Sequence, residues 1–149
     1  MSIFNQINED IKKAMLAKEK EKLEALRAVK AAFLLAKTAE GGNNEIPEDQ
    51  ELKIIQKLVK QRQDAAEIYK AQNRQDLYEP EIFQAQIISN YLPAQMSAKE
   101  VEAIVAEIIN EVGASSLKDM GKVMAVANKK LSGQTDNKTL SEIIKNKLS

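Results

Sequence analysis

The sequence predicts an all-α protein, with an N-terminal domain of three to four longer helices followed by a small tail domain of three helices. Apolar residues recur every three or four positions along nearly the whole chain, which is the periodicity of an amphipathic helix. Neither a strand-type alternation of useful length nor an internal repeat is found in the sequence. At 149 residues the chain is long enough to bury a sizeable core.

Two helices are expected before the first glycine-rich segment. Ser2 can cap the first, and the second runs from about residue 20 to residue 40. Their predicted inward positions are Phe4, Ile7, Ile11 and Met15, then Leu23, Leu26, Val29, Phe33 and Leu34. The residues leave open whether these two helices are continuous. The run Gly41-Gly42-Asn43-Asn44 is expected to end the second helix.

A third helix opens at Pro47 and reaches about Gln72. The acidic residues Glu48, Asp49 and Glu51 fall in its first turn, where the positive end of the helix dipole explains them. Its inward positions are Leu52, Ile55, Leu58, Val59, Ala66 and Tyr69.

A fourth helix follows a break at Asn73 and Arg74. Pro80 is placed in its opening turn, because its missing N–H is harmless only there. The apolar residues of this helix are Phe83, Ile87, Ile88 and Tyr91.

The domain boundary is predicted at residues 91–96, because Pro93 pushes Leu92 out of helical geometry. The predicted domains are residues 1–92 and 97–149. Ser97 and Glu100 then form a capping box that opens the fifth helix. That helix carries the apolar positions Val101, Ile104, Val105, Ile108 and Val112.

Two further helices complete the tail. Gly113 suits the left-handed residue past the fifth helix, and Ser116, with Asp119 three residues on, is expected to cap the sixth. The sixth helix spans about residues 117–131, with Met120, Val123, Met124, Ala127 and Leu131 inward, and ends at Ser132-Gly133. Asp136 or Thr135 caps the last helix, whose apolar positions are Leu140, Ile143, Ile144 and Leu148.

The candidate functional site is the lysine-rich surface around Gly121. A glycine inside a helix costs about 1 kcal/mol relative to alanine, so another backbone or a ligand should approach it closely. Close helix packing is the favoured explanation, and a phosphate-backbone contact the alternative. Residues 113–149 carry seven lysines against three acidic residues, although the formal net charge of the chain is zero. The candidate nucleic-acid-binding residues are Lys118, Gly121, Lys122, Lys129, Lys130 and Lys138.

The composition argues against independent catalysis. The chain has no cysteine and no histidine, which removes thiolate nucleophiles, Cys/His zinc sites and imidazole acid–base chemistry. Gly121-Lys122 fails as a phosphate loop, because Ser116 and Val123 stand where that motif needs a glycine and a hydroxyl. A Ser–Lys pair of Ser115 or Ser116 with Lys118 is less simple than a helix cap. No catalytic residue, metal or cofactor is therefore assigned.

Two further expectations concern the surroundings of the chain. The first ten residues lack a secretory signal, and no stretch approaches the ~20 apolar residues of a membrane span, so a cytoplasmic protein without a membrane partner is expected. Lys60, Arg62 and Arg74 are further candidates for an anionic partner, with solvated helix faces as the default interpretation.

Most of the chain resembles the small YqeY-like proteins, which are related to the C-terminal tail of the B subunit of tRNA-dependent amidotransferase. The matching segments, in order, are Arg27-Ala28-Val29-Lys30-Ala31-Ala32, Lys60-Gln61-Arg62-Gln63-Asp64, Arg74-Gln75-Asp76-Leu77, Tyr91-Leu92-Pro93-Ala94-Gln95-Met96-Ser97 and residues 113–124. The resemblance implies an all-helical fold and a tail that contacts the tRNA body, whereas transamidation belongs to a domain absent here. Gln134, where the family carries a basic residue, and Pro80 depart from the pattern.

Three function classes follow from these observations. The first is a non-catalytic accessory module that binds tRNA or another structured RNA through the basic tail. The second is a carbon–nitrogen ligase with glutamine as amide donor, which the resemblance implies by association. The third is a helical protein–protein adaptor. Releasing ammonia from glutamine needs an activated nucleophile, so the second class is disfavoured.

Overall fold

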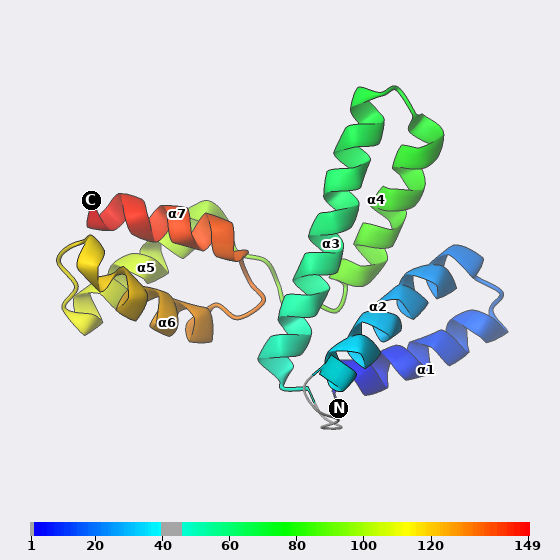
Figure 1. The fold of residues 1–149 in the computed structure, drawn as a ribbon, viewed down its shortest axis with the longest axis horizontal. Coiled ribbons are helices and arrows are strands. Elements are labelled where there is room, and N and C mark those ends of the chain that lie inside the picture. The colour runs from blue at the N-terminus through cyan, green and yellow to red at the C-terminus, as the bar shows by residue number, and fades with distance from the viewer. Residues whose placement is uncertain (1, 40–45) are drawn as a thin grey trace. The chain divides into compact units, whose positions relative to one another are not determined.

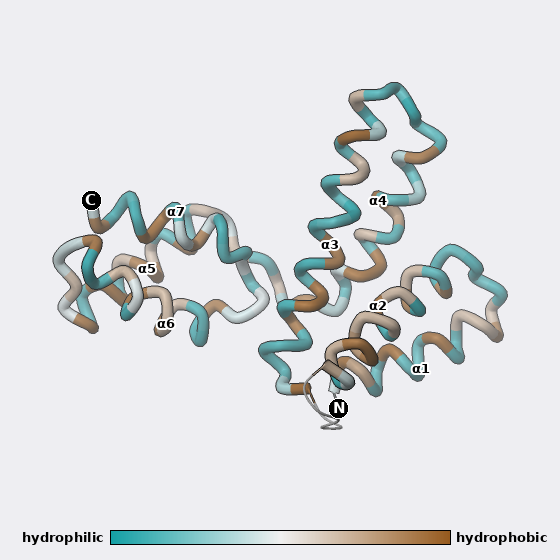
Figure 2. The backbone as a smooth tube through the Cα atoms, in the orientation of Figure 1, coloured by the Kyte–Doolittle hydropathy of each residue, from teal (hydrophilic) through white to brown (hydrophobic). Residues whose placement is uncertain are grey.

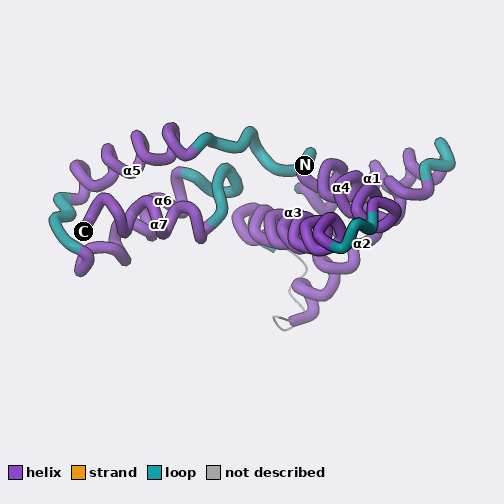
Figure 3. Tube along the Cα trace, turned by 90° about the horizontal axis from the view of Figure 1, so that it is seen from above, coloured by secondary structure: helices purple, strands orange, loops and turns teal. Residues whose placement is uncertain are grey.

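A computed structural model describes residues 2–39 and 46–149 of the chain. The described part is built of α-helices and contains no strand, which confirms the all-α prediction (Figures 1 and 3). The helices are α1 (Ile3–Leu16), α2 (Lys20–Ala39), α3 (Glu48–Ala71), α4 (Gln75–Ser89), α5 (Ala98–Val112), α6 (Met120–Lys130) and α7 (Asn137–Leu148), with a 3-10 turn, η1 (Leu117–Asp119), before α6.

The chain divides into two compact units, Met1–Leu92 and Pro93–Ser149, called unit 1 and unit 2 below. Apolar residues recur along the helices of both units (Figure 2). The core of unit 1 consists of Ile7, Ala14, Ala25, Leu26, Val29, Phe33, Ile55, Val59, Ala85 and Ile88. The core of unit 2 consists of Val101, Val105, Ile108, Val123, Ala127, Leu131, Leu140, Ile143, Ile144 and Leu148.

Helices α1 and α2 are two separate helices, which settles a question that the sequence left open. The chain turns at Lys18, which has a left-handed backbone with φ of 58°. At the other end of α1, the Ser2 hydroxyl accepts the Asn5 N–H at 3.1 Å, as predicted. The predicted inward positions Met15 and Leu34 are wrong, because these side chains are 53% and 44% exposed. The predicted stop at Gly41–Asn44 lies outside the described residues.

Pro80 lies in the interior of α4, so its predicted place in the opening turn is wrong. The helix begins at Gln75, because the Arg74 carbonyl accepts the N–H groups of Leu77 and Tyr78. The Arg74 guanidinium also donates twice to the Asp76 carboxylate, at 3.1 and 3.0 Å. These contacts start the helix before the proline, whose missing N–H removes the helical donor for the Asp76 carbonyl.

Glu51 has a structural role that the sequence did not reveal. Its side chain is only 3% exposed, and its Oε2 accepts the Phe4 N–H at 3.0 Å. The first turn of α3 therefore supplies an acceptor for one of the orphan N–H groups at the start of α1. Helix-dipole stabilisation alone, the explanation drawn from the sequence, is incomplete for this residue.

The segment between the two units is anchored within each of them. In unit 1, the Tyr91 hydroxyl donates to the Asp10 carboxylate of α1. In unit 2, the Gln95 amide donates to the Gly133 carbonyl at 2.6 Å, and the Met96 N–H donates to the Gln134 carbonyl at 2.9 Å. Gln134, a departure from the family pattern, therefore uses its backbone in a structural contact.

Replacing Tyr91 by Phe is expected to lower the free energy of unfolding by about 1–2 kcal/mol, because the Asp10 carboxylate loses a donor. Partial burial and the hydrogen bond to Asp10 raise the pKa of Tyr91 above its ordinary value. The stabilisation is thus complete below about pH 10 and declines as the pH rises further. Urea unfolding followed by circular dichroism measures both effects.

Tyr78→Phe is the matched control for this experiment, because the structure gives the Tyr78 hydroxyl no hydrogen bond to any described residue. It should change the free energy of unfolding by less than about 0.5 kcal/mol. Equal losses in the two variants would contradict a specific role for the Tyr91–Asp10 contact.

Candidate nucleic-acid interface

The turn before α6 is closed by a carboxylate and a left-handed glycine. Gly113 ends α5 with φ of 68°, as predicted. Asp119 Oδ2 then accepts the Ser115 N–H at 3.0 Å. The predicted cap by the Ser116 hydroxyl is wrong, since that side chain makes no capping bond in the described structure. The reason is that the first turn is the 3-10 helix η1. The Asp119 carboxylate at the end of η1 accepts the Ser115 N–H and closes the turn without the Ser116 hydroxyl.

Helix α6 buries one face and exposes the other. Val123, Ala127 and Leu131 enter the core of unit 2. The opposite surface is exposed and consists of Gly121, Lys122, Ala125 and Lys129 of α6 together with Lys118 of the preceding η1 turn, and we call it the α6 lysine face. Residues three, four and seven apart on an α-helix share a face, so the spacing within α6 places Gly121, Lys122, Ala125 and Lys129 together. The sequence-based prediction did not include Ala125, although its position four residues after Gly121 places it on the same helix face.

Among the described residues, no neighbouring helix fills the space beside Gly121. A Cβ atom added to it would meet no heavy atom of the described residues within 4 Å outside its own helix backbone. The helix-packing explanation favoured from the sequence is therefore wrong, because the space that the missing Cβ leaves is open. The propensity cost of a glycine at this position, about 1 kcal/mol, has no compensation within the described structure.

The six candidate residues do not form one cluster. Lys118, Gly121, Lys122 and Lys129 share the α6 lysine face. The Lys130 ammonium lies 3.1 Å from the Glu111 carboxylate of α5 and is paired there, which weakens its assignment as a free phosphate contact. Lys138 is exposed in the first turn of a different helix, α7. Within the described residues, Lys118, Lys122 and Lys129 have no ion pair.

Two of the basic candidates in unit 1 are engaged by neighbouring side chains. Arg62 donates to the Gln84 side chain at 3.0 Å and to the Leu58 carbonyl at 3.2 Å. Arg74 pairs with Asp76, and this hydrogen bond raises the pKa of Arg74 and lowers that of Asp76. Lys60 is exposed on α3. Arg62 thus links α3 to α4, and Arg74 stabilises the first turn of α4.

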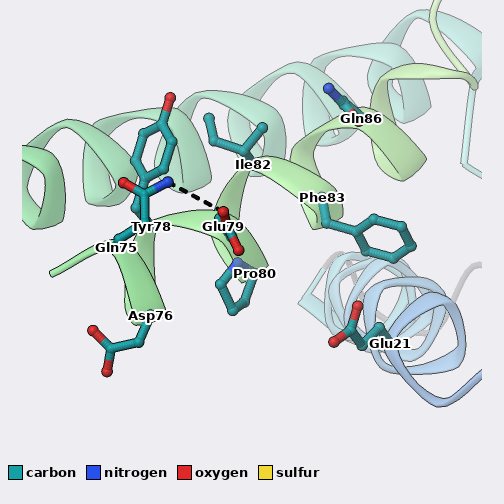
Figure 4. Close-up of a pocket in the computed structure, with 9 residues that line it drawn as sticks. All are labelled: Glu21, Gln75, Asp76, Tyr78, Glu79, Pro80, Ile82, Phe83 and Gln86. Carbon is teal, nitrogen blue, oxygen red and sulfur yellow. Dashed lines mark hydrogen bonds between the residues drawn. The ribbon is translucent and has the colours of Figure 1, made fainter.

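A shallow hollow of about 480 Å³ lies beside α4 in unit 1 (Figure 4). Its lining residues are Glu21, Gln75, Asp76, Tyr78, Glu79, Pro80, Ile82, Phe83 and Gln86. The Gln75 amide donates to Glu79 at 3.2 Å across one side of it. These residues supply carboxylates, amides, aromatic rings and the Tyr78 hydroxyl, but no serine, threonine or lysine nucleophile, so we make no catalytic assignment to the hollow.

Residues 4–148 match the model of the family described as "Yqey-like protein". The chain belongs to the YqeY-like family. The resemblance drawn from the sequence motifs is thereby confirmed.

Three proteins named "Altered inheritance of mitochondria protein 41, mitochondrial" are similar to this YqeY-like chain. The one from Clavispora lusitaniae is 28% identical over 76% of this chain and 66% of its own length. The one from Kluyveromyces lactis is 29% identical over 90% and 69%. The one from Lachancea thermotolerans is 31% identical over 74% and 59%. The chain thus spans about two thirds of the length of these relatives.

The cytoplasmic localisation predicted from the sequence is wrong by this comparison, since all three relatives are named as mitochondrial proteins. The prediction relied on the lack of a secretory signal and of a membrane span. The lack of both features does not distinguish a cytoplasmic protein from a mitochondrial one. Among the described residues, no helix is both long and apolar enough to span a membrane.

Proposed function

We propose that this YqeY-like chain is a non-catalytic module that binds the phosphate backbone of tRNA or another structured RNA through the α6 lysine face. The observation that carries the proposal is Gly121, an exposed helical glycine with open space at its Cβ position and lysines around it. A glycine there lets a sugar–phosphate backbone approach the helix more closely than any other residue would. The family relationship to the tRNA-contacting tail of an amidotransferase subunit supports the same assignment.

Lysines suit a backbone contact better than a base contact. An ammonium group neutralises a phosphate and releases its counterions without reading sequence. Lys118, in the η1 turn, precedes Gly121 by three residues and Lys122 follows it directly, while Lys129 lies seven residues further along α6. We therefore expect affinity that falls steeply with salt and depends little on RNA sequence.

Replacing Lys118 and Lys122 together by Gln tests the proposal. The slope of log affinity against log salt should shrink by about 2, roughly one unit for each phosphate that is no longer neutralised. Fluorescence anisotropy with labelled tRNA transcript over a range of salt concentrations measures this slope. The matched control is Lys53→Gln with Lys57→Gln on α3, which removes the same charge from exposed positions of unit 1. An equal effect of both double variants would contradict a specific α6 site.

Gly121→Ala separates backbone approach from charge. Because the added methyl group meets open space, the variant should be more stable by up to about 1 kcal/mol. Its RNA affinity should nevertheless fall, since the methyl group holds the phosphate backbone away. Unchanged affinity in both the glycine and the lysine variants would favour the adaptor class. Ammonia release from glutamine by the purified chain would instead favour the ligase class.

A further inference from the structure

The turn between α1 and α2 contains a residue type that is unusual for its backbone conformation. The Glu19 N–H donates to the Ala14 carbonyl at 3.0 Å, and the Lys18 N–H donates to the Met15 carbonyl at 3.2 Å. This pair of bonds is the Schellman ending of a helix, in which the left-handed residue is usually glycine. Here that residue is Lys18, with φ of 58°. A lysine at this position costs conformational free energy that glycine would avoid.

Two large apolar side chains stand exposed at the same turn. Leu16 is 85% exposed and Met15 is 53% exposed, although they are consecutive residues at the end of α1. Figure 1 shows this turn at the end of the α1–α2 hairpin that is opposite the N-terminus. Single exposed apolar residues are common on soluble proteins, but an adjacent pair at a projecting turn is a small apolar patch.

Positive charge surrounds the apolar pair. Residues 12–22, which we call the α1–α2 tip, contain five lysines and two glutamates, an excess of three positive charges. The lysines are Lys12, Lys13, Lys18, Lys20 and Lys22. Of these five lysines, only Lys22 forms an ion pair with a described residue, with Glu19 at 3.8 Å. Four exposed ammonium groups are thus available around Met15 and Leu16.

We propose that the α1–α2 tip docks onto the surface of an anionic lipid bilayer. Apolar side chains at the tip enter the boundary between headgroups and acyl chains, while lysines extend their stems along it and pair with lipid phosphates. An anionic leaflet attracts such a basic segment electrostatically. An RNA backbone would use the lysines but would gain nothing from an exposed Leu16 and Met15. This peripheral contact departs from the expectation, drawn from hydropathy alone, of no membrane partner.

Vesicle co-sedimentation of the full chain tests the proposal. We expect binding to phosphatidylcholine vesicles that contain phosphatidylserine, and much weaker binding to pure phosphatidylcholine. Replacing both Met15 and Leu16 by Ser should weaken binding at least about tenfold, because the apolar area that inserts is removed. Both side chains are largely exposed, so the fold should be retained.

Lys18→Gly is the sharpest variant, because its two effects have opposite signs. Glycine suits the left-handed backbone, so the melting temperature should be unchanged or higher. Binding to anionic vesicles should fall about fivefold, which corresponds to one lysine near a charged leaflet. A lower melting temperature would show that Lys18 is retained for folding, and would overturn the argument from its conformation.

Further measurements distinguish membrane binding by the α1–α2 tip from RNA binding. The Lys118→Gln, Lys122→Gln variant of α6 should bind anionic vesicles as the unaltered chain does. Equal binding to vesicles with and without phosphatidylserine, or full binding by the Met15, Leu16 double Ser variant, would overturn the proposal. Weakened tRNA binding by the tip variants, without vesicle binding by the unaltered chain, would identify the tip as an RNA surface instead.

Discussion

Replacing Phe33 by Ala is expected to lower the free energy of unfolding of unit 1 by about 3–5 kcal/mol. Phe33 is fully buried in α2, and its ring lies 6.2 Å from the ring of Phe4, centroid to centroid. Truncation leaves a cavity in the middle of this core, and the flanking helices can fill it only in part. The loss is large against the whole stability of a domain of this size.

The tyrosines make this prediction specific to one unit. All three, Tyr69, Tyr78 and Tyr91, belong to unit 1, and the chain has no tryptophan. Intrinsic fluorescence therefore reports the unfolding of unit 1, whereas circular dichroism reports helices of both units. In Phe33→Ala the tyrosine transition should move to lower urea concentration, and circular dichroism should show a second, later step.

Ile144→Ala is the matched change in unit 2. Ile144 is fully buried in α7, so its truncation should cost about 2–5 kcal/mol. We expect this variant to leave the tyrosine transition in place while part of the circular dichroism signal disappears earlier. A shift of the tyrosine transition by the same amount would show that the two units unfold together, and would refute the domain organisation proposed from the sequence.

Local signals explain why most of the fold was predictable. Ser2, Ser97 and Asp136 accept the N–H groups of Asn5, Glu100 and Thr139, as their positions before apolar helical patterns indicate. Gly113 has the left-handed backbone that its place after α5 requires. Each of these features depends on neighbours within four residues, which a sequence shows directly.

The errors concern contacts between distant residues or the edges of a helix face. Periodicity indicates the centre of the buried stripe but not its width, so Met15 and Leu34 were wrongly placed inside. The spacing of Lys118 and Lys122 predicted one helix face for both, but Lys118 lies in the η1 turn that precedes α6. The surroundings of Gly121 depend on which helices lie nearby, and no local pattern reports the open space that the structure places there.

Glu51→Ala is expected to cost about 2–3 kcal/mol, because it removes a buried charged acceptor from the Phe4 N–H of α1. Glu48→Ala is the matched control, since it removes a carboxylate from the same first turn of α3 but from an exposed position. The control should cost only the dipole contribution, about 0.3–1 kcal/mol. Urea unfolding followed by tyrosine fluorescence measures both.

Glu51→Gln distinguishes the contact from the charge. The Gln side chain keeps the shape of Glu and a carbonyl oxygen that can accept the Phe4 N–H, so most of the stability should be retained. If Glu51→Ala cost no more than Glu48→Ala, the dipole alone would explain the residue and the contact with α1 would contribute nothing. A larger cost for Glu51→Ala, largely recovered in Glu51→Gln, means that the first turn of α3 fixes the start of α1. In that case the buried Glu51 carboxylate connects α3 to α1, although the two residues in contact are 47 positions apart in the sequence.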